Sequence, residues 1–399
     1  MADIRLLELR STYKWGGGPD KTILLSAQQH DPARVTVVVA YLRDVNDHEF
    51  QITDMARKRG LTYYEILENG KFDLKVLLKL RDIIVEHDIN LIHAHDYKTD
   101  FFGYLLKWWL RKRGLTFLST QHAWVMTDAM GSLYQRLDQF ILSRFDHTIA
   151  VSESTKQEMV AVGIPESKIS VIHNGIEPHV WSSDQVTFDF RRELGISADA
   201  PLIGYVGRIM PEKDLETWLQ AASLVAKQYP QARFVLVGEG RDGTFLTKLQ
   251  ELAESVGISE NVLFPGYRRD LISVYGAFDI FVLSSLREGL PNSILEAMAL
   301  GVPVVTTDVA GAKELVVDGE AGFVVPQQSP VQLANRVLEL LDNPETLRRM
   351  QQASRHRIET EFSFAKRLDR IEKLYAKILG VKLPEKTSPI PAVALCGRN

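Results

Sequence analysis

The segment Ser284–Asp308 reads SSLREGLPNSILEAMALGVPVVTTD and carries the clearest structural signal of the chain. It begins at the end of an apolar run, DIFVLSS, turns at Gly-Leu-Pro, continues as PNSILEAMALG and closes with a β-branched run, PVVTTD. A strand, a helix that begins near Pro291 and a second strand in this order predict a βαβ unit of a parallel sheet. Two glutamates, Glu288 and Glu296, stand on either side of the predicted helix start with seven residues between them.

The same alternation of strand and helix extends over nearly the whole chain. Runs rich in β-branched residues are separated by stretches with helical spacing, such as DLKVLLKLRDIIVEHD and FQITDMARKRG. The predicted buried strands lie at 4–9, 35–40, 89–95, 115–120 and 147–152, and then at 201–209, 233–240, 261–267, 279–285 and 303–308. This pattern predicts an α/β protein with two doubly wound, Rossmann-like domains that face a central cleft.

The expected domain boundaries follow from turn residues and composition. HNGIEPHVWSSDQ follows a strand, ISVIH, and separates an N-terminal domain at 1–178 from a C-terminal domain at 179–361. The last long helical pattern, 362–380, is expected to cross back and complete the N-terminal domain. The proline-rich residues 381–399 are expected to form a flexible tail.

Composition excludes several classes of protein. The chain has 399 residues, 45% hydrophobic and 25% charged, with a formal net charge of −4, so no global positive field attracts nucleic acid. The single cysteine, Cys396, allows no intrachain disulfide and no cysteine-based metal site. No signal peptide and no apolar run of about 18 residues are evident. We therefore expect a cytoplasmic protein, with peripheral contact at the inner face of the membrane as an open alternative.

The chemistry is expected in the loops that follow the strands, because ligands of open parallel sheets bind beyond their carboxyl ends. The start of the helix near Pro291 has unsatisfied N–H groups and a partial positive charge that suit a phosphate. Glu288 can accept hydrogen bonds from a polyol, and Glu296 from a diol such as ribose. The alternative is a capping pair on a core helix.

Three other loops have the same position relative to a strand. GRIMPEKD contains Arg208 and Lys213, which can clamp a diphosphate or can simply be solvated surface charges. The triple glycine that begins at Gly16 can bring backbone amides to an anion, or can form a plain tight turn. His122 follows a strand and is either a cleft residue or a structural hydrogen-bonding group.

His93 and His95 alternate along one strand, as metal ligands do, but no third ligand follows at convincing spacing. Structural hydrogen bonding is therefore the favoured interpretation of the pair, and no metal site is predicted.

Taken together, these motifs resemble the retaining glycosyltransferases of the GT-B fold, glycosyltransferase family 4. E288-GLPNSIL-E296 matches the EX7E motif of that family, and GGG, QHAW, VIHNGIEP, GRIMPEKD, LVGEG, FPGY and VAGAKELVVDGEAGFVV occur in family order. The resemblance covers about Ile4 to Gly380. It implies transfer of a sugar from a UDP- or GDP-linked donor to a hydroxyl of a glycan, a lipid-linked or a small-molecule acceptor, in cell-envelope polysaccharide or glycolipid synthesis.

The resemblance also implies roles for individual residues. Arg208 and Lys213 would hold the diphosphate, Glu288 the sugar hydroxyls, and His122 would face the transferred sugar. The remaining donor-binding residues would be Gly16, Gly17, Tyr267, Arg268, Gly289, Leu290, Ser293, Ile294 and Glu296, with Tyr267 and Arg268 at the base. No metal ion or other cofactor is expected, because cationic side chains replace the metal.

Two departures and two rival functions accompany the resemblance. VAGAKELV stands where relatives often have Gly-Gly-x-x-Glu, which leaves Glu314 as an uncertain match, and the triple glycine differs from the usual double glycine. A nucleotide-sugar epimerase of the same fold and a catalytically idle, glycan-binding partner subunit are the alternatives. A glycan phosphorylase would need a pyridoxal phosphate lysine, which is not identifiable.

FFGYLLKWWLRKRG, Phe101–Gly114, combines Trp108 and Trp109 with a basic end and is the candidate for membrane contact. The alternative is a core helix that buries its apolar face against a sheet, with basic residues that favour its C-terminal end.

Overall fold

The computed structural model describes residues 3–386, except 15, 71–72, 123–128 and 241–242. These residues form two compact units. Of the described residues, unit 1 contains those in the ranges 3–151, 155–172 and 367–386, and unit 2 contains those in the ranges 152–154 and 173–366. The chain passes from unit 1 to unit 2 after residue 172, six residues before the boundary expected at 178. It returns to unit 1 at Arg367.

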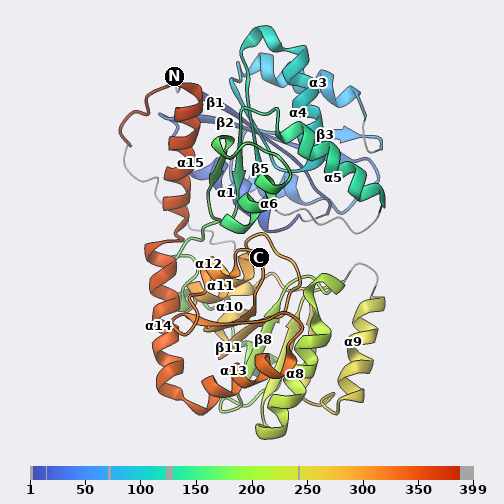
Figure 1. Ribbon diagram of the computed structural model, residues 1–399, viewed down its shortest axis with the longest axis vertical. Helices are drawn as coiled ribbons and strands as arrows, with labels where there is room; N and C mark the ends of the chain where they lie inside the picture. Colours follow the sequence, from blue (N-terminus) through green and yellow to red (C-terminus); the bar gives the residue numbers. More distant parts are fainter. Residues whose placement is uncertain (1–2, 15, 71–72, 123–128, 241–242, 387–399) are drawn as a thin grey trace. The chain divides into compact units, whose positions relative to one another are not determined.

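The sheet of unit 1 has seven parallel strands in the order β3-β2-β1-β4-β5-β6-β7 (Figure 1). The order reverses between β1 and β4, which pair directly, so the switch point of this doubly wound sheet lies between these two strands. The strand bounds are β1 Ile4–Ser11, β2 Val35–Asp44, β3 Tyr63–Glu68, β4 Leu91–Ala94, β5 Thr116–Gln121, β6 His147–Ala150 and β7 Ile169–Val171.

Helices cover both faces of this sheet. A large apolar core joins one face to side chains of α3, α4, α5 and α6, and a smaller core joins the other face to α1 and α2. α15 lies on the second face, where Tyr375 is fully buried and bonds to His93 of β4 (Figure 1). The bounds are α1 Gly18–Gln29, α2 Ile52–Lys58, α3 Lys75–Glu86, α4 Tyr97–Trp109, α5 Ala129–Leu142, α6 Glu153–Ala161 and α15 Phe364–Leu379.

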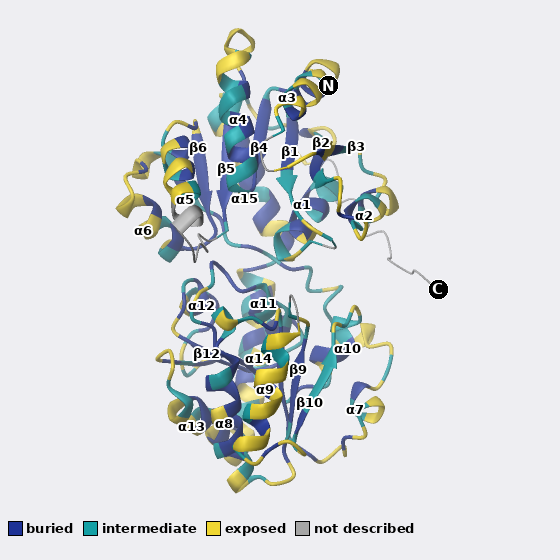
Figure 2. Ribbon diagram, turned by 90° about the vertical axis from the view of Figure 1, so that its right-hand side faces the viewer, coloured by how far each residue is buried: buried dark blue, intermediate teal, exposed yellow. Residues whose placement is uncertain are grey.

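The sheet of unit 2 has six parallel strands in the order β10-β9-β8-β11-β12-β13, and its switch point lies between β8 and β11. Its strands are β8 Leu202–Val206, β9 Arg233–Val237, β10 Val262–Gly266, β11 Ile280–Leu283, β12 Val304–Thr307 and β13 Gly322–Val325. Its helices are α7 Phe190–Glu193, α8 Leu215–Gln228, α9 Thr244–Ser255, α10 Leu271–Gly276, α11 Asn292–Ala299, α12 Ala312–Leu315, α13 Pro330–Asp342 and α14 Pro344–Thr360. The central strands are uniformly buried, as expected for a parallel sheet covered on both faces (Figure 2).

The predicted fold class, two doubly wound Rossmann-like units in tandem, is confirmed by these topologies. Two strands were not predicted, β3 and β13, and each is the edge strand of its sheet. β3 reads YYEILE, contains two glutamates and is only partly buried, so it lacks the continuous apolar run of a central strand. Residues 381–386 form no helix or strand, and the rest of the expected tail lies outside the described residues.

Among the residues that the structure describes, no helix is long and apolar enough to cross a membrane.

Candidate active site

The loops after β8 and β11 meet at the switch point of unit 2. The first loop leads through a 3-10 turn, Pro211–Lys213, into α8, and the second contains Glu288 and leads into α11. Because β8 and β11 are neighbours, their carboxyl ends bring residues about 75 positions apart in sequence into contact.

Lys213 and Glu288 form the centre of this site. The Lys213 ammonium lies 2.6 Å from the Glu288 carboxylate, and each side chain is only 13% exposed. The Ser285 hydroxyl donates to the same carboxylate oxygen at 2.7 Å. Ser284 donates to the carbonyls of Lys213 and Asp214, at 2.8 and 2.9 Å, which ties the two loops together. The sequence predicted the two charged residues separately, and the structure brings them together.

Arg208 differs from Lys213 in that it is largely solvated. Its side chain is 65% exposed and its guanidinium lies 3.7 Å from the Glu212 carboxylate. The backbone at Arg208 is fixed, because its carbonyl accepts a 2.8 Å hydrogen bond from the Tyr205 hydroxyl. Burial of Tyr205, with a smaller effect of the Glu288 charge, raises the pKa of this phenol well above its usual range, so it remains a donor. Arg208 thus has an anchored backbone and a side chain that can move onto an anion.

The first turn of α11 presents one of the two amides expected to meet phosphate. The Ile294 N–H donates to the Pro291 carbonyl at 3.1 Å and is therefore already used, while Ser293 is half-buried. One turn further, Glu296 accepts a 2.9 Å hydrogen bond from the buried Tyr275 hydroxyl. This bond fixes the carboxylate of Glu296 on the helix.

The loop Gly289–Leu290 packs against a glycine that the sequence did not single out. Gly311 has φ +72°, and a Cβ on it would lie 2.5 Å from the Gly289 carbonyl oxygen and 2.8 Å from Leu290 Cδ1. Both the backbone conformation and the space therefore require glycine at this position. In VAGAKELV, where the family pattern was not matched, Gly311 is the residue that lets the Glu288 loop adopt its position.

Glu314 follows Gly311 on α12 and is bound within unit 2. Its carboxylate accepts hydrogen bonds from the Glu153 amide at 2.9 Å and from His173 Nε2 at 2.6 Å. Burial alone would raise its pKa, but these hydrogen bonds lower the pKa of Glu314 overall. This arrangement makes Glu314 a structural acceptor in the present conformation.

The two residues expected at the base of the nucleotide differ in exposure and in partners. Tyr267 follows β10 and is exposed. Arg268 forms ion pairs with Glu193 and Asp270, at 2.6 and 2.7 Å, and lies over the rings of Phe188 and Phe190. Hydrogen bonds to Asp270 and Glu193 raise the pKa of Arg268. Arg268 thus helps to hold the α7 segment.

In unit 1, Gly16 and Gly17 immediately precede α1, but the Asp20 carboxylate already accepts the hydrogen bond of the Gly17 amide. Gly16 has φ +72°, which favours glycine, and the Gly17 N–H donates to Asp20 Oδ2 at 2.7 Å. Asp20 also accepts from Thr12 at 3.2 Å and from Arg10 at 3.4 Å. The internal aspartate therefore holds the glycine loop in its turn.

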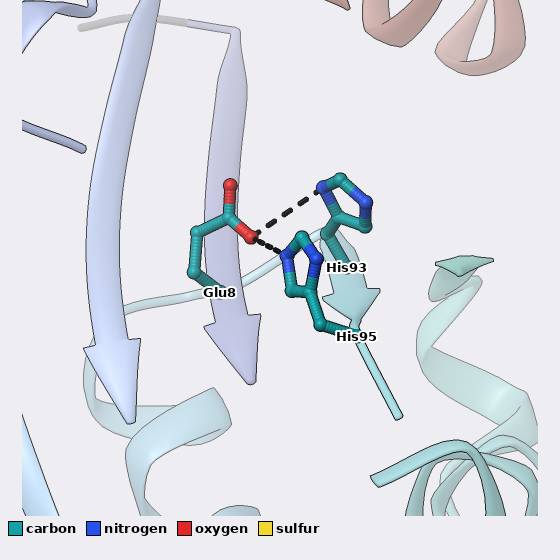
Figure 3. A group of neighbouring side chains, drawn as sticks. All are labelled: Glu8, His93 and His95. Carbon is teal, nitrogen blue, oxygen red and sulfur yellow. Dashed lines mark hydrogen bonds and ion pairs between the residues drawn. The ribbon is translucent and has the colours of Figure 1, made fainter. Parts of the chain in front are cut away.

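Next to the switch point of unit 1, the buried carboxylate of Glu8 on β1 points towards the imidazoles of His93 and His95 (Figure 3). His95 Nε2 donates to Glu8 Oε2 at 2.6 Å, and His93 Nδ1 lies 3.4 Å from the same oxygen. The other partners of His93 are Tyr375 at 2.7 Å and Thr120 at 2.6 Å. Glu8 is the third residue that the histidine spacing lacked, and it comes from the neighbouring strand.

Within the described residues, Glu8, His93 and His95 are the one group with three metal-ligating atoms within 4.8 Å of one another. Two ligands of a tetrahedral zinc lie about 3.4 Å apart, since zinc–nitrogen and zinc–oxygen bonds are roughly 2.1 Å. The 2.6 Å contact of His95 with Glu8 is instead the length of a charge-assisted hydrogen bond. Burial and the neighbouring His93 lower the pKa of His95 to about 3, so its ring is neutral near neutral pH. The geometry thus favours structural hydrogen bonding.

His122 follows β5 and stacks on His95, with ring centroids 5.9 Å apart. Burial, and then the positive charge of Arg10, hold the pKa of His122 well below its usual range. Its Nε2 atom is buried and has no hydrogen-bond partner among the described residues. His122 is therefore a neutral imidazole with one nitrogen available for a ligand.

Two family models match the chain over consecutive ranges. Residues 16–180 match the model described as Glycosyltransferase Family 4, and residues 186–357 match Glycosyl transferases group 1. The chain belongs to glycosyltransferase family 4. The predicted enzyme class, a glycosyltransferase, is thereby confirmed.

Curated relatives of this family 4 glycosyltransferase align over most of their length. The chain is 25% identical over 319 residues to N-acetyl-alpha-D-glucosaminyl L-malate synthase of Bacillus anthracis, covering 79% of this chain and 82% of the relative. It is 26% identical over 313 residues to UDP-Gal:alpha-D-GlcNAc-diphosphoundecaprenol alpha-1,3-galactosyltransferase of Escherichia coli, covering 76% and 79%. The crystal structure of HepE from Anabaena with UDP-glucose has a TM-score of 0.82 at 20% identity and covers 94% of this chain and 100% of that chain. This last similarity shows the shared fold.

Proposed function

We propose that this glycosyltransferase transfers a sugar from a nucleoside-diphosphate sugar, UDP- or GDP-linked, to an acceptor hydroxyl with retention of the anomeric configuration. The observation that carries the proposal is the Lys213–Glu288 pair at the switch point of unit 2. A nucleoside-diphosphate sugar carries a negatively charged diphosphate next to a sugar rich in hydroxyl groups, and an adjacent cation and carboxylate can bind these two parts. The ammonium suits the diphosphate, and the carboxylate accepts hydrogen bonds from the sugar hydroxyls.

The reaction requires stabilisation of the leaving diphosphate. As the bond between the anomeric carbon and the phosphate oxygen breaks, negative charge grows on the diphosphate. Lys213, Arg208 and the Ser293 amide at the start of α11 supply positive charge and a donor to it. On the same face of the sugar, the departing oxygen accepts the proton of the acceptor hydroxyl, and the acceptor oxygen bonds to the anomeric carbon. Glu296 would bind the ribose, while Tyr267, Arg268, Gly289 and Leu290 would complete the donor site.

His122 and the loop Gly16–Gly17 are the proposed contributions of unit 1. The unpartnered Nε2 of His122 supports hydrogen bonding to a hydroxyl of the transferred sugar. The Gly17 amide already donates to Asp20, so the donor would contact the outer side of the glycine loop.

We further propose an acceptor from cell-envelope polysaccharide or glycolipid synthesis, used in the cytoplasm. The diphosphoundecaprenol named for the Escherichia coli relative is one example of a lipid-linked acceptor. A lipid-linked acceptor would bring the enzyme to the inner leaflet of a membrane, so peripheral membrane contact is part of the proposal. No metal ion is required in this scheme, because two cationic side chains balance the diphosphate.

The test is release of UDP or GDP from a panel of sugar nucleotides, with and without acceptors, in the presence of EDTA. Lys213→Ala and Glu288→Gln should each lower acceptor-dependent turnover by at least about 100-fold, the effect of losing one transition-state contact. Lys248→Ala and Glu251→Gln on the exposed face of α9 make the same chemical changes away from the site and should leave turnover unchanged.

Proton NMR of the product's anomeric centre reports retention. An inverted product would contradict the mechanism, and folded Lys213→Ala and Glu288→Gln variants with full activity would contradict the site. Conversion of the sugar nucleotide without release of nucleotide would indicate an epimerase, and binding without turnover an idle partner subunit.

A further inference from the structure

The helices α4 and α5 of unit 1 form one continuous outer surface. Both pack on the same core, and Tyr97 stacks on Tyr134 with centroids 5.7 Å apart. About two helical turns further, Tyr104 meets Phe140 edge-on at 6.3 Å. Residues further along both helices are therefore also neighbours, since the two helices run in the same direction from the carboxyl edge of the sheet.

This surface exposes more large apolar groups than the packing of the two helices explains. α5 buries Ile141 and Leu142 in the core, yet Leu133, Leu137 and Phe140 on another face are 61%, 39% and 47% exposed. Their spacing of four and three residues gives a stripe along the helix. At the end of α4, Trp108 is 70% and Trp109 41% exposed. Isolated exposed apolar residues are ordinary, but five on two adjacent helices mark an interaction surface.

The exposed charges near this stripe are mostly positive. Apart from Lys98 in the first turn of α4, which pairs with Glu68, the exposed or half-buried basic residues on α4, the following 3-10 turn, α5 and its end are Lys107, Arg111, Lys112, Arg113, Arg136 and Arg144. The acids of these segments, Asp100 and Asp138, are buried in the core, and Asp146 at the end of α5 is the exposed one. Lys107 pairs with Asp146 at 2.6 Å, and Arg113 with Asp88 at 3.0 Å, which leaves the surface basic. The whole chain, in contrast, has a net charge of −4.

The basic side chains lie directly over the exposed aromatic rings. The Arg111 guanidinium is 5.8 Å from the Trp108 ring centroid, and that of Arg144 is 3.4 Å from the Phe140 centroid. Aromatic and aliphatic groups flanked by long cationic side chains suit the boundary between lipid headgroups and acyl chains. There the rings enter the apolar layer and the cations meet phosphates.

We propose that the α4–α5 surface docks on a bilayer that contains anionic lipid. The proposal deepens the proposed function, on which it rests, by naming the face of the enzyme that would meet a membrane holding a lipid-linked acceptor. A bilayer is favoured over a protein partner because six cations, two of them paired with aspartates, lie on the same two helices and their ends as the apolar stripe, and a broad anionic surface can meet them together. The stripe on α5 adds three exposed apolar side chains to the two tryptophans at the end of Phe101–Gly114.

The experiment is co-sedimentation of the full chain with vesicles of phosphatidylcholine, with or without roughly 30 mol% phosphatidylglycerol. The wild type should bind the anionic vesicles at least about ten times more strongly, and high salt should weaken the binding. Leu137→Ser with Phe140→Ser, and Arg111→Glu with Lys112→Glu, should each reduce binding several-fold. Lys227→Glu with Lys248→Glu, exposed residues of unit 2, makes the same charge change and should leave binding intact.

Equal binding to both vesicle types, no binding by the wild type, or equal loss in the unit 2 control would overturn the proposal. So would a dimer that forms through this face in solution and dissociates in the Phe140 variant, since a second copy would then cover the stripe. Nucleotide release with a soluble acceptor is measured separately. Vesicle binding without any transfer would refute the proposed function alone, and transfer without vesicle binding would refute the docking surface alone.

Discussion

Replacing Lys213 by alanine should destabilise unit 2 as well as inactivate it, and the size of the effect follows from its contact with Glu288. The ion pair is 2.6 Å long with both side chains 13% exposed, so its loss leaves a mostly buried carboxylate without its cation. Fully buried pairs cost about 3–5 kcal/mol to break and surface pairs at most about 1 kcal/mol. The Ser285 hydroxyl still donates to Glu288, so we expect about 2 kcal/mol. In a unit of this size that lowers the melting temperature by about 4–8 °C.

A double-mutant cycle with Glu288→Gln, followed by urea and thermal unfolding, tests this expectation. Removing the charge of Glu288 in the Lys213→Ala background should recover part of the stability, with a coupling energy above about 1 kcal/mol. The Lys313–Asp308 pair is an internal control, because it has the same 2.6 Å distance but side chains 65% and 48% exposed. Lys313→Ala should cost less than about 0.5 kcal/mol. Equal losses in the two pairs, or a coupling energy near zero, would refute the argument from burial.

Three further predictions concern other parts of the fold. In unit 1, burial raises the pKa of Glu372, but its hydrogen bonds lower this pKa overall below the ordinary value of 4.5. The carboxylate therefore contributes stability above pH 4.5, and this contribution is lost as acid protonates the carboxylate below that pH. Urea unfolding of Glu372→Gln should show a weaker dependence of stability on pH below 4.5. Gly311→Ala should cost at least about 1 kcal/mol and lower turnover, because its methyl group meets the Gly289 carbonyl and its φ is positive; near-normal kinetics would show that the Glu288 loop moves freely. His95→Ala should destabilise unit 1 by about 1–3 kcal/mol in urea, since it removes the hydrogen bond that the neutral imidazole donates to the buried carboxylate of Glu8, and an unchanged stability would indicate that Glu8 is protonated in the fold.

The sequence predicted the two parallel sheets and the motifs at their edges because buried strands and loop residues have strong local patterns. β13 was missed since GFVV is short and follows a run of turn residues, and β3 because an edge strand is only half covered. The signal for Glu8 was present as an acid inside the apolar run IRLLEL, but its partners come from another strand and could not be inferred.

Contacts between distant loops account for the remaining differences. The sequence gives no register between β8 and β11, so the pairing of Lys213 with Glu288 emerged only in the fold. Arg268 has its carboxylate partners 75 residues upstream and two residues downstream, which fixed motifs do not reveal. The apolar stripe of α5 was hidden because a helix with two apolar faces has the same composition as an ordinary buried helix.

The return of the chain to unit 1 at Arg367 has a consequence for the order of events during synthesis. Residues 1–172 emerge from the ribosome long before α15 does, yet Glu372 accepts from His30 at 3.0 Å and from Arg34 at 3.1 Å, and Tyr375 bonds to His93 at 2.7 Å. Until α15 has been synthesised, these polar groups lack their α15 partners, and the second face of the sheet has no α15 to cover it. Unit 1 is therefore begun first and completed after unit 2, and a nascent chain arrested before α15 presents a partly uncovered sheet face to chaperones and proteases.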